Sequence, residues 1–394
     1  MDPDPSSLPD STRPPAAAAP IRFDRFEWAG AFGDLGTLVP FVAAYVSLMG
    51  MDPYGILFTL GVALVACGLV YRTPFPVQPM KAIGAVATTQ AAQTIVITPG
   101  AVYASGLITG AIWLLLGWTG AARRIAALMA RPVAMGIILG LGFAFMFEGI
   151  KMMATGWIMG GIALAGTLLL LANPVVPAML LLLFFGVVAA VVQDPGLIQE
   201  FRGIEAGLRW PTWSLAQVAW NDVAVGFVFL ALPQLPLTMG NAIIAISEEN
   251  NRLFPERTVS EKKVSISTGI MNLIAPLAGG VPLCHGAGGM AGHVRFGART
   301  GGAPIILGIL LVGLATFFSA SLETVIKMFP APVLGVILFL AGAQLARGAW
   351  DENTSVNDRM VVLTTAALAV WNVGIAFVFG AAVHALMKRK LVKW

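Results

Sequence analysis

The chain has 394 residues, of which 57% are hydrophobic and only 11% are charged. Soluble domains carry roughly 25% charged residues, so this composition excludes a water-soluble enzyme and a nucleic-acid-binding module. The mean hydropathy of +0.82 is typical of a protein whose helices cross the lipid bilayer many times. The two cysteines lie in apolar or glycine-rich segments, so no disulfide framework is predicted.

The chain begins with a tail. Residues 1–25 are rich in Pro, Ser and Ala and lack the apolar run of a signal peptide, which predicts a disordered cytoplasmic segment. Apolar segments then follow one another to residue 388, and residues 389–394 form a short cytoplasmic tail. Membrane-spanning helices are predicted near 29–48, 54–71, 100–118, 133–148, 155–172 and 176–193, and, after an extracellular connecting loop at 194–217, near 218–246, 262–276, 304–321, 331–346, 358–371 and 374–388.

Two further crossings are interrupted. Residues 74–93 open with three prolines in six residues, and residues 279–297 contain seven glycines, so neither predicts an uninterrupted helix. Each predicts an extended entry followed by a half-helix. Paired interruptions at corresponding positions of two halves indicate the binding site of a transporter. The alternative is that Pro and Gly only kink two packed helices.

With these two segments the count is fourteen crossings. They divide into two seven-span halves, 26–193 and 218–388, and an odd number of spans makes the halves inverted in the membrane. With both termini cytoplasmic, nineteen of the 24 basic residues lie on the cytoplasmic side, as the positive-inside rule requires. The predicted fold class is an all-α polytopic membrane protein with a 7+7 inverted repeat.

The first interrupted segment carries Gln78, Pro79, Met80, Lys81 and Ala82. Pro79 suits the first turn of a half-helix that points its free N–H groups into the protein. A lysine at that positive end, deep in a membrane, is unfavourable without an anion in front of it. We therefore predict anion binding, with a structural ion pair to Asp34 as the alternative.

The second interrupted segment is predicted to start its half-helix near Cys284. Its residues with a predicted role are Cys284, His285, Gly286, Ala287, Gly288 and Gly289. Small residues leave backbone N–H groups open to a ligand, although glycines also serve helix packing in membranes. His285 is a candidate to hydrogen-bond an oxyanion or to carry a proton. The spacing fits no zinc site, and no cofactor is predicted.

The first span of each half adds polar groups. Asp34 and Thr37 lie in the first span, and Gln234 and Asn241 lie in the eighth. An ionisable residue inside a membrane is functional by default, so Asp34 is a candidate to neutralise Lys81 or to bind a proton coupled to transport. Gln234, Thr238 and Asn241 could donate to the substrate, and bridging of helices is the alternative.

Four motifs in order resemble one family. The segments FGDLGTLVP (32–40), PVQPMKAI (76–83), PQLPLTMGN (233–241) and PLCHGAGGMAGHVRFGAR (282–299) resemble the molybdate transporter family related to SulP-type sulfate permeases. The resemblance covers about residues 26–390. It implies a core domain that carries the site and a gate domain, and it implies substrate contacts from 79–82, 284–289 and the spans around Asp34 and Gln234. The chain ends soon after Lys388, so the regulatory STAS domain of the wider group is not expected.

The sequence therefore predicts a secondary active transporter of the cell membrane. Its substrate would be molybdate, with sulfate or tungstate as competitors, held between the two half-helices, with a proton coupled through Asp34 or His285. The lipid bilayer is its other partner, no nucleic acid is expected, and the oligomeric state is open, a homodimer included. The alternatives are a nucleobase or organic anion transporter, an anion channel, and an intramembrane enzyme using Cys284 and His285, for which no catalytic triad is evident.

Overall fold

The protein is described here from a computed structural model. The structure describes residues 20–89, 96–121, 130–170, 178–203, 206–295, 297–321, 324, 327–348, 355–371, 373–389 and 391. Within these ranges the chain is almost entirely helical. Four helical stretches are long and apolar enough to cross a membrane, namely Pro53–Tyr71, Pro99–Thr119, Arg131–Ala154 and Trp220–Leu253. The architecture is thus that of a helical membrane protein.

The helices and strands follow the chain in two sets. The first set contains α1 (Arg25–Ala31), η2 (Phe32–Asp34), α2 (Leu35–Met49), α3 (Pro53–Tyr71), β1 (Gln78–Pro79), α4 (Lys81–Thr89), α5 (Pro99–Thr119), α7 (Arg131–Ala154), α8 (Trp157–Leu170) and α9 (Ala178–Gln193). The short elements α10 (Gly196–Arg202) and η3 (Leu215–Gln217) follow it, within the predicted connecting loop.

The second set begins with an irregular helical run. It contains α11 (Trp220–Val225), η4 (Gly226–Ala231), α12 (Leu232–Leu237), η5 (Thr238–Ala245), α13 (Ile246–Leu253), η6 (Pro255–Arg257), α14 (Glu261–Ile274), η7 (Ala275–Ala278), β2 (Leu283–Cys284), α15 (Ala287–Arg295), α16 (Gly302–Phe318), η8 (Ser319–Ser321), α18 (Ala331–Gly348), α19 (Val356–Trp371) and α20 (Val373–Lys388). Two predicted spans are longer than expected, because the helix predicted to end at 148 continues to Ala154 and the one predicted to end at 246 continues to Leu253.

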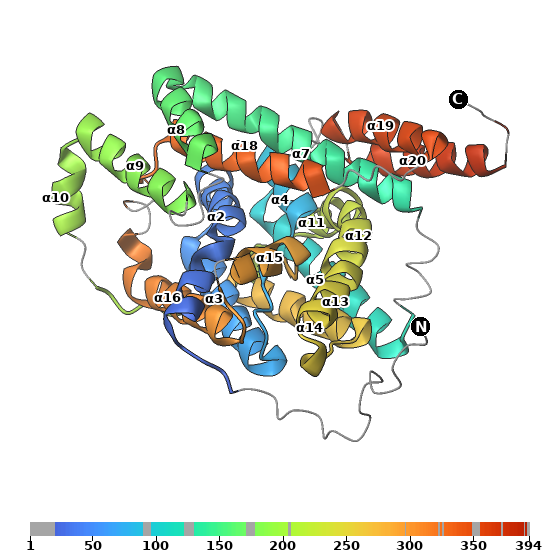
Figure 1. Cartoon of the computed structure of the whole chain (residues 1–394), viewed down its shortest axis with the longest axis horizontal. Helices are drawn as coiled ribbons and strands as arrows, with labels where there is room; N and C mark the ends of the chain where they lie inside the picture. The colour runs from blue at the N-terminus through green and yellow to red at the C-terminus, as the bar shows by residue number, and fades with distance from the viewer. Residues whose placement is uncertain are drawn as a thin grey trace, which may run out of the picture.

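The helices form two groups (Figure 1). In one group α3 packs against α16 and α5 against α14, and α4 and α15 lie among them. In the other, α7 packs along α18 and α19, next to α8 and α20. Glycines allow α7 and α18 to approach closely, since a β-carbon at Gly142 would lie 2.7 Å from the carbonyl oxygen of Gly342, and one at Gly149 would lie 2.6 Å from that of Gly335.

A small sheet lies at the centre of the first group. Strand β1 pairs with β2 in antiparallel fashion, with Gln78 opposite Cys284 and Pro79 opposite Leu283. The N–H of Met80 also donates to the carbonyl of Pro282 at 2.8 Å. Backbone groups inside a membrane need partners within the protein, and this pairing supplies them for the extended segments. The fold is therefore not purely α-helical as predicted.

The sheet also moves both helix starts from the predicted positions. Helix α4 begins at Lys81 and α15 at Ala287, so Pro79 and Cys284 belong to strands and not to first helical turns. The physical reason is that strand pairing keeps both segments extended until the ladder ends. The main apolar cluster of the protein surrounds the sheet, and its fully buried members include Val77, Met80 and Leu283.

Candidate functional site

Two half-helices begin at the central ladder. Since β1 and β2 are antiparallel and each leads into its own helix, α4 and α15 leave the ladder in opposite directions. The first turn of a helix carries N–H groups without intrahelical acceptors and the positive end of the helix dipole. The fold thus brings two anion-attracting helix ends to one place, with Lys81 half-buried at the start of α4.

Asp34 and Gln78 meet against the start of α15. The side chain of Gln78 donates from Nε2 to Asp34 Oδ1 at 2.5 Å, and both side chains are buried. A β-carbon at Gly289 would lie 2.9 Å from Asp34 Oδ2, and one at Gly286 would lie 2.6 Å from Gln78 Oε1. These two glycines are therefore needed for close packing. Gly288 differs, because it is exposed and has nothing within 4 Å of its β-carbon position, so α15 is open on that side.

Gln234 lies against the first turn of α4. Its Oε1 accepts hydrogen bonds from the N–H of Ala82 at 2.8 Å and of Ile83 at 3.2 Å, and its Nε2 donates to Thr238 Oγ1 at 2.8 Å. Asn241, half-buried, has its Nδ2 3.6 Å from the β-carbon position of Gly286. The eighth predicted span thus contacts both half-helices.

His285 joins the two interrupted segments. Its Nδ1 lies 2.8 Å from the carbonyl oxygen of Pro76, and its Nε2 lies 2.8 Å from Ser267 Oγ, which in turn lies 2.6 Å from the hydroxyl of Tyr71. A carbonyl only accepts, so Nδ1 carries a proton and donates a hydrogen bond to the carbonyl oxygen of Pro76. The imidazole therefore joins the residue after β2 to the entry of β1 through Nδ1 and to α14 through Nε2.

Asn272 secures the other side of β2. Its Oδ1 accepts from the N–H of Leu283 at 2.8 Å and its Nδ2 donates to the carbonyl of the same residue at 2.6 Å. Sequence reasoning missed Asn272, Ser267 and Tyr71. The signal that could have found them is a polar side chain inside an apolar span, which in a membrane needs a partner.

The remaining predicted site residues take different positions. Ala82 and Cys284 are buried, Ala287 is half-buried, and Thr37 lies on α2 with its side chain outside the described part. One further group was missed: Tyr45 on α2 is fully buried, and within the described residues its hydroxyl has no hydrogen-bond partner. This hydroxyl lies 3.3 Å from the β-carbon position of Gly84, one turn into α4. It is a free donor beside the candidate site.

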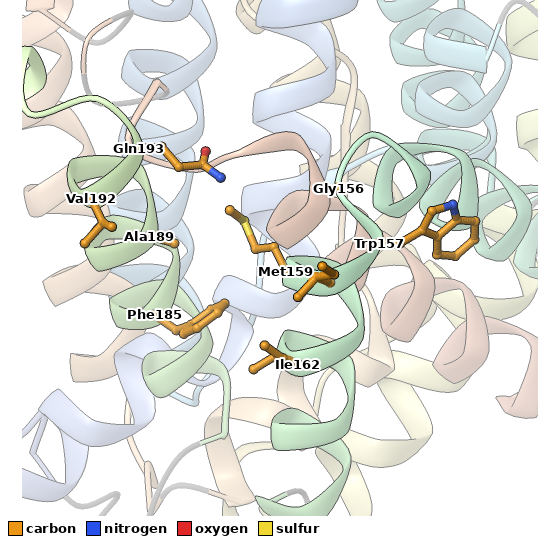
Figure 2. Close-up of a pocket in the computed structure, with 9 residues that line it drawn as sticks. Gly156, Trp157, Met159, Ile162, Phe185, Ala189, Val192 and Gln193 are labelled. Atoms are coloured by element: carbon orange, nitrogen blue, oxygen red, sulfur yellow. The ribbon is translucent and has the colours of Figure 1, made fainter.

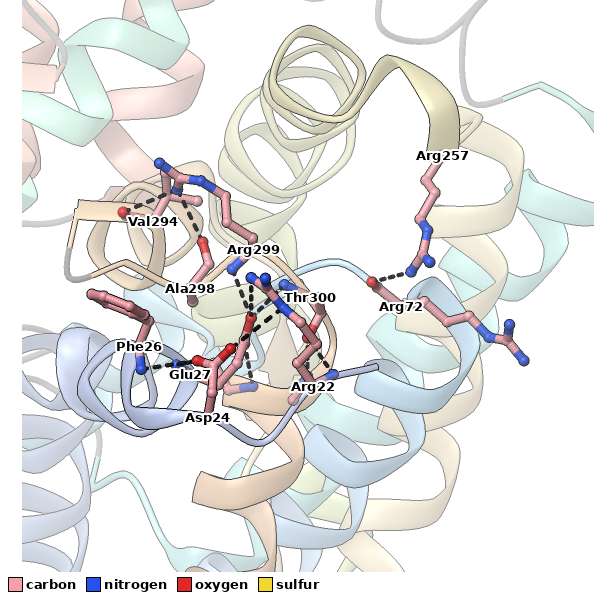
Figure 3. Close-up of polar contacts among 12 residues, drawn as sticks. Arg22, Asp24, Phe26, Glu27, Arg72, Arg257, Val294, Ala298, Arg299 and Thr300 are labelled. Carbon is pink, nitrogen blue, oxygen red and sulfur yellow. Dashed lines mark hydrogen bonds and ion pairs between the residues drawn. The ribbon is translucent and has the colours of Figure 1, made fainter. Parts of the chain in front are cut away.

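The loop that follows α15 is fixed by a buried carboxylate (Figure 3). Glu27 on α1 is fully buried; its Oε1 accepts from the N–H of Arg299 and of Thr300, each at 2.9 Å, and its Oε2 from the N–H of Ala303 at 3.0 Å. Arg22 Nη2 lies 3.9 Å from the same carboxylate. Residues at the end of the predicted tail are thus joined to the loop that follows α15.

A surface groove between α8 and α9 lies away from this site (Figure 2). It is lined by Trp157, Met159, Ile162, Phe185, Ala189 and Val192, with Gly156, Ile158 and Gln193. Trp157, Ile158 and Val192 are strongly exposed. An oxyanion needs several donors, whereas this lining is almost entirely apolar, so the groove does not suit an anion.

The fold defines a class of protein, the helical membrane transporters. The chain aligns with the transmembrane domain of the cyanobacterial bicarbonate transporter BicA with a TM-score of 0.66 at 14% identity. The alignment covers 91% of this chain and 98% of that one. It also aligns with murine Slc26a9, an anion transporter in the inward-facing state, with a TM-score of 0.66 at 12% identity over 96% of this chain and 70% of that one. At such low identity these likenesses show the fold.

The sequence comparisons give the family. The chain belongs to the family described as "Molybdate transporter of MFS superfamily", whose profile matches residues 26–145 and 226–345, one segment in each predicted half. It is 33% identical to "Molybdate transporter 2" of Arabidopsis thaliana over 93% of this chain and 87% of that protein. "Molybdate transporter 1" of Chlamydomonas reinhardtii is 27% identical over 90% of this chain and 89% of that protein. The predicted family resemblance is confirmed, and the relatives are named as transporters, not as enzymes.

Proposed function

We propose that this protein is a secondary active transporter of a tetrahedral oxyanion, with molybdate as its substrate, held between the starts of α4 and α15. The observation that carries the proposal is the β1–β2 ladder, which joins two half-helix N-termini beside Lys81. A tetrahedral dianion presents acceptors in all directions and so matches donors that converge from two helices. The choice of molybdate over sulfate rests on the names of the relatives.

We further propose a fourteen-span inverted repeat whose two helix groups move against each other. The pattern of helix pairs supports it. By their order in the two halves, α3 corresponds to α14, α5 to α16, α7 to α18 and α8 to α19. The packed pair α3–α16 then has its counterpart in α14–α5, and the packed pair α7–α19 has its counterpart in α18–α8. The half-helices belong to the group built on α3, α5, α14 and α16, and the group built on α7 and α18 would act as the gate. Substrate would be released by alternating access.

Proton coupling is assigned to Asp34. Both ring nitrogens of His285 are engaged in structural contacts, Nδ1 with the carbonyl of Pro76 and Nε2 with Ser267 on α14, so its proton has a structural role. Asp34 lies beside the first turn of α15 and accepts from Gln78, so a proton on its carboxylate would change the charge next to the substrate.

The test compares Lys81→Ala with wild type and with Lys151→Ala. Lys151 is an exposed lysine that pairs with Glu148 at 3.1 Å, far along α7, and serves as the matched control. Loss of the Lys81 charge is expected to weaken molybdate binding by about tenfold or more. Calorimetry on the purified protein measures affinity, and uptake into proteoliposomes with sulfate, tungstate and uracil as competitors measures selectivity. Unchanged affinity in folded Lys81→Ala would contradict the site, and saturable uptake of uracil in place of molybdate would contradict the substrate.

A further inference from the structure

The donors of α4 are already occupied by another part of the protein. The N–H groups of Ala82 and Ile83 belong to the first helical turn, which has no intrahelical acceptors and would be the part offered to an anion. In the structure both point to a single amide oxygen, Oε1 of Gln234, at 2.8 and 3.2 Å. A neutral side chain thus fills the position of an anion oxygen.

Gln234 is held in this position by one further contact. Its Nε2 donates to Thr238 Oγ1 at 2.8 Å, one turn further along the same helical run, and both side chains are buried. The backbone around Gln234 is irregular, with π-helical stretches in η4 and η5 on either side of α12 and with Pro233 and Pro236 within it. Such π-helical segments are frequent at functional sites.

We propose that Gln234 is an exchangeable cap of α4 that selects for anions. Without substrate its amide oxygen holds the two N–H groups, and a bound oxyanion displaces it and takes over both donors. This inference rests on the proposed transport of an oxyanion by the same site. Hydrogen bonds to a charged acceptor are about twice as strong as those to a neutral one, so an anion gains from the exchange whereas water or a neutral solute gains nothing.

The competing interpretation is a permanent cap, in which Gln234 ties α12 to α4 in every state. The two interpretations predict opposite signs. If the cap is exchangeable, the substrate competes with Oε1, and removing that acceptor makes binding of the anion tighter. If the cap is permanent, removing it disorders the first turn of α4 and weakens binding or leaves it unchanged.

Three variants of the full-length protein in lipid nanodiscs separate these outcomes, with molybdate affinity measured by calorimetry at neutral pH. Gln234→Met keeps the length of the side chain and removes the acceptor, so binding is expected to tighten by about fivefold. Gln234→Glu places a charged competitor on the same two donors and is expected to weaken binding by about tenfold or more. Thr238→Val removes the partner that orients the amide and should change affinity in the direction of Gln234→Met, by less.

The results overturn the two ideas separately. Wild-type protein that binds molybdate, together with a Gln234→Met variant that binds it equally or more weakly, would refute the exchangeable cap and leave the proposed function intact. Wild-type protein that binds no oxyanion would refute the proposed function and the cap with it. If Gln234→Met does not fold, Gln234→Glu tests the proposal, because the carboxylate retains the length of the side chain and its acceptor. A molybdate affinity of Gln234→Glu as high as that of wild type would contradict competition between residue 234 and the substrate.

Discussion

Replacement of Glu27 by alanine should destabilise the protein strongly, although this residue lies outside the candidate site. Three backbone N–H groups donate to its carboxylate, and two of them, those of Thr300 and Ala303, belong to buried residues. An N–H left buried without an acceptor costs about 1–3 kcal/mol, so the loss of both acceptors amounts to about 2–6 kcal/mol. The third N–H group, that of exposed Arg299, can hydrogen-bond to water instead.

Two further variants calibrate this value. Glu27→Gln keeps Oε1, which accepts from Arg299 and Thr300, and places an amide group against the N–H of Ala303, so it should cost about 1–2 kcal/mol. Glu249→Ala removes a carboxylate of the same chain whose partner is exposed Arg252, and it should cost about 0–1 kcal/mol. Thermal unfolding of the purified protein, followed by intrinsic fluorescence, measures the three variants together. If Glu27→Ala has the same melting temperature as Glu249→Ala, the assignment of Glu27 as the residue that fixes this loop is refuted.

Two other predictions concern access and coupling. Gly288→Cys should react with a water-soluble thiol reagent and be protected by molybdate, because α15 is open at this position. Gly207→Cys, in an exposed loop, is the control and should react without protection. Equal protection of the two cysteines by molybdate would contradict a site at α15. The native cysteines are both buried and leave the background low. Asp34→Asn should retain molybdate binding within about threefold but lose the stimulation of uptake by an inward proton gradient, as measured in proteoliposomes; stimulation equal to that of wild type would exclude Asp34 as the proton carrier.

The place of the interrupted segments could be predicted from local chemistry. Proline and glycine act on the residues next to them, so the breaks near 76–79 and 279–286 are visible without knowledge of the fold. Their pairing could not be predicted, because Pro76 and His285 are 209 residues apart and strands of two residues have no periodicity to detect. The same ladder explains why the helix starts were predicted too early.

The end of one long helix and the partners of two polar side chains also differ from, or go beyond, what the sequence predicts. The helix predicted to end at 148 continues to Ala154, and Glu148 and Lys151 pair within this extension at 3.1 Å. Sequence reasoning identified Asp34 and Gln234 as polar groups within spans, with Lys81 as the candidate partner of Asp34 and the partner of Gln234 left open. Partners such as Gln78 and the N–H groups of Ala82 and Ile83 come from distant segments, and only the fold brings them together.

The central ladder also determines the order in which the protein can be assembled. Strand β1 is synthesised long before its partner β2, and until β2 arrives the ladder hydrogen bonds of 78–80, including that from the N–H of Met80 to Pro282, cannot form. Each backbone group left without a partner costs several kcal/mol in hydrocarbon. We therefore expect this segment to be sheltered by a neighbouring helix or by insertion machinery during synthesis, and its half-helix to reach its final position only after β2 is in place.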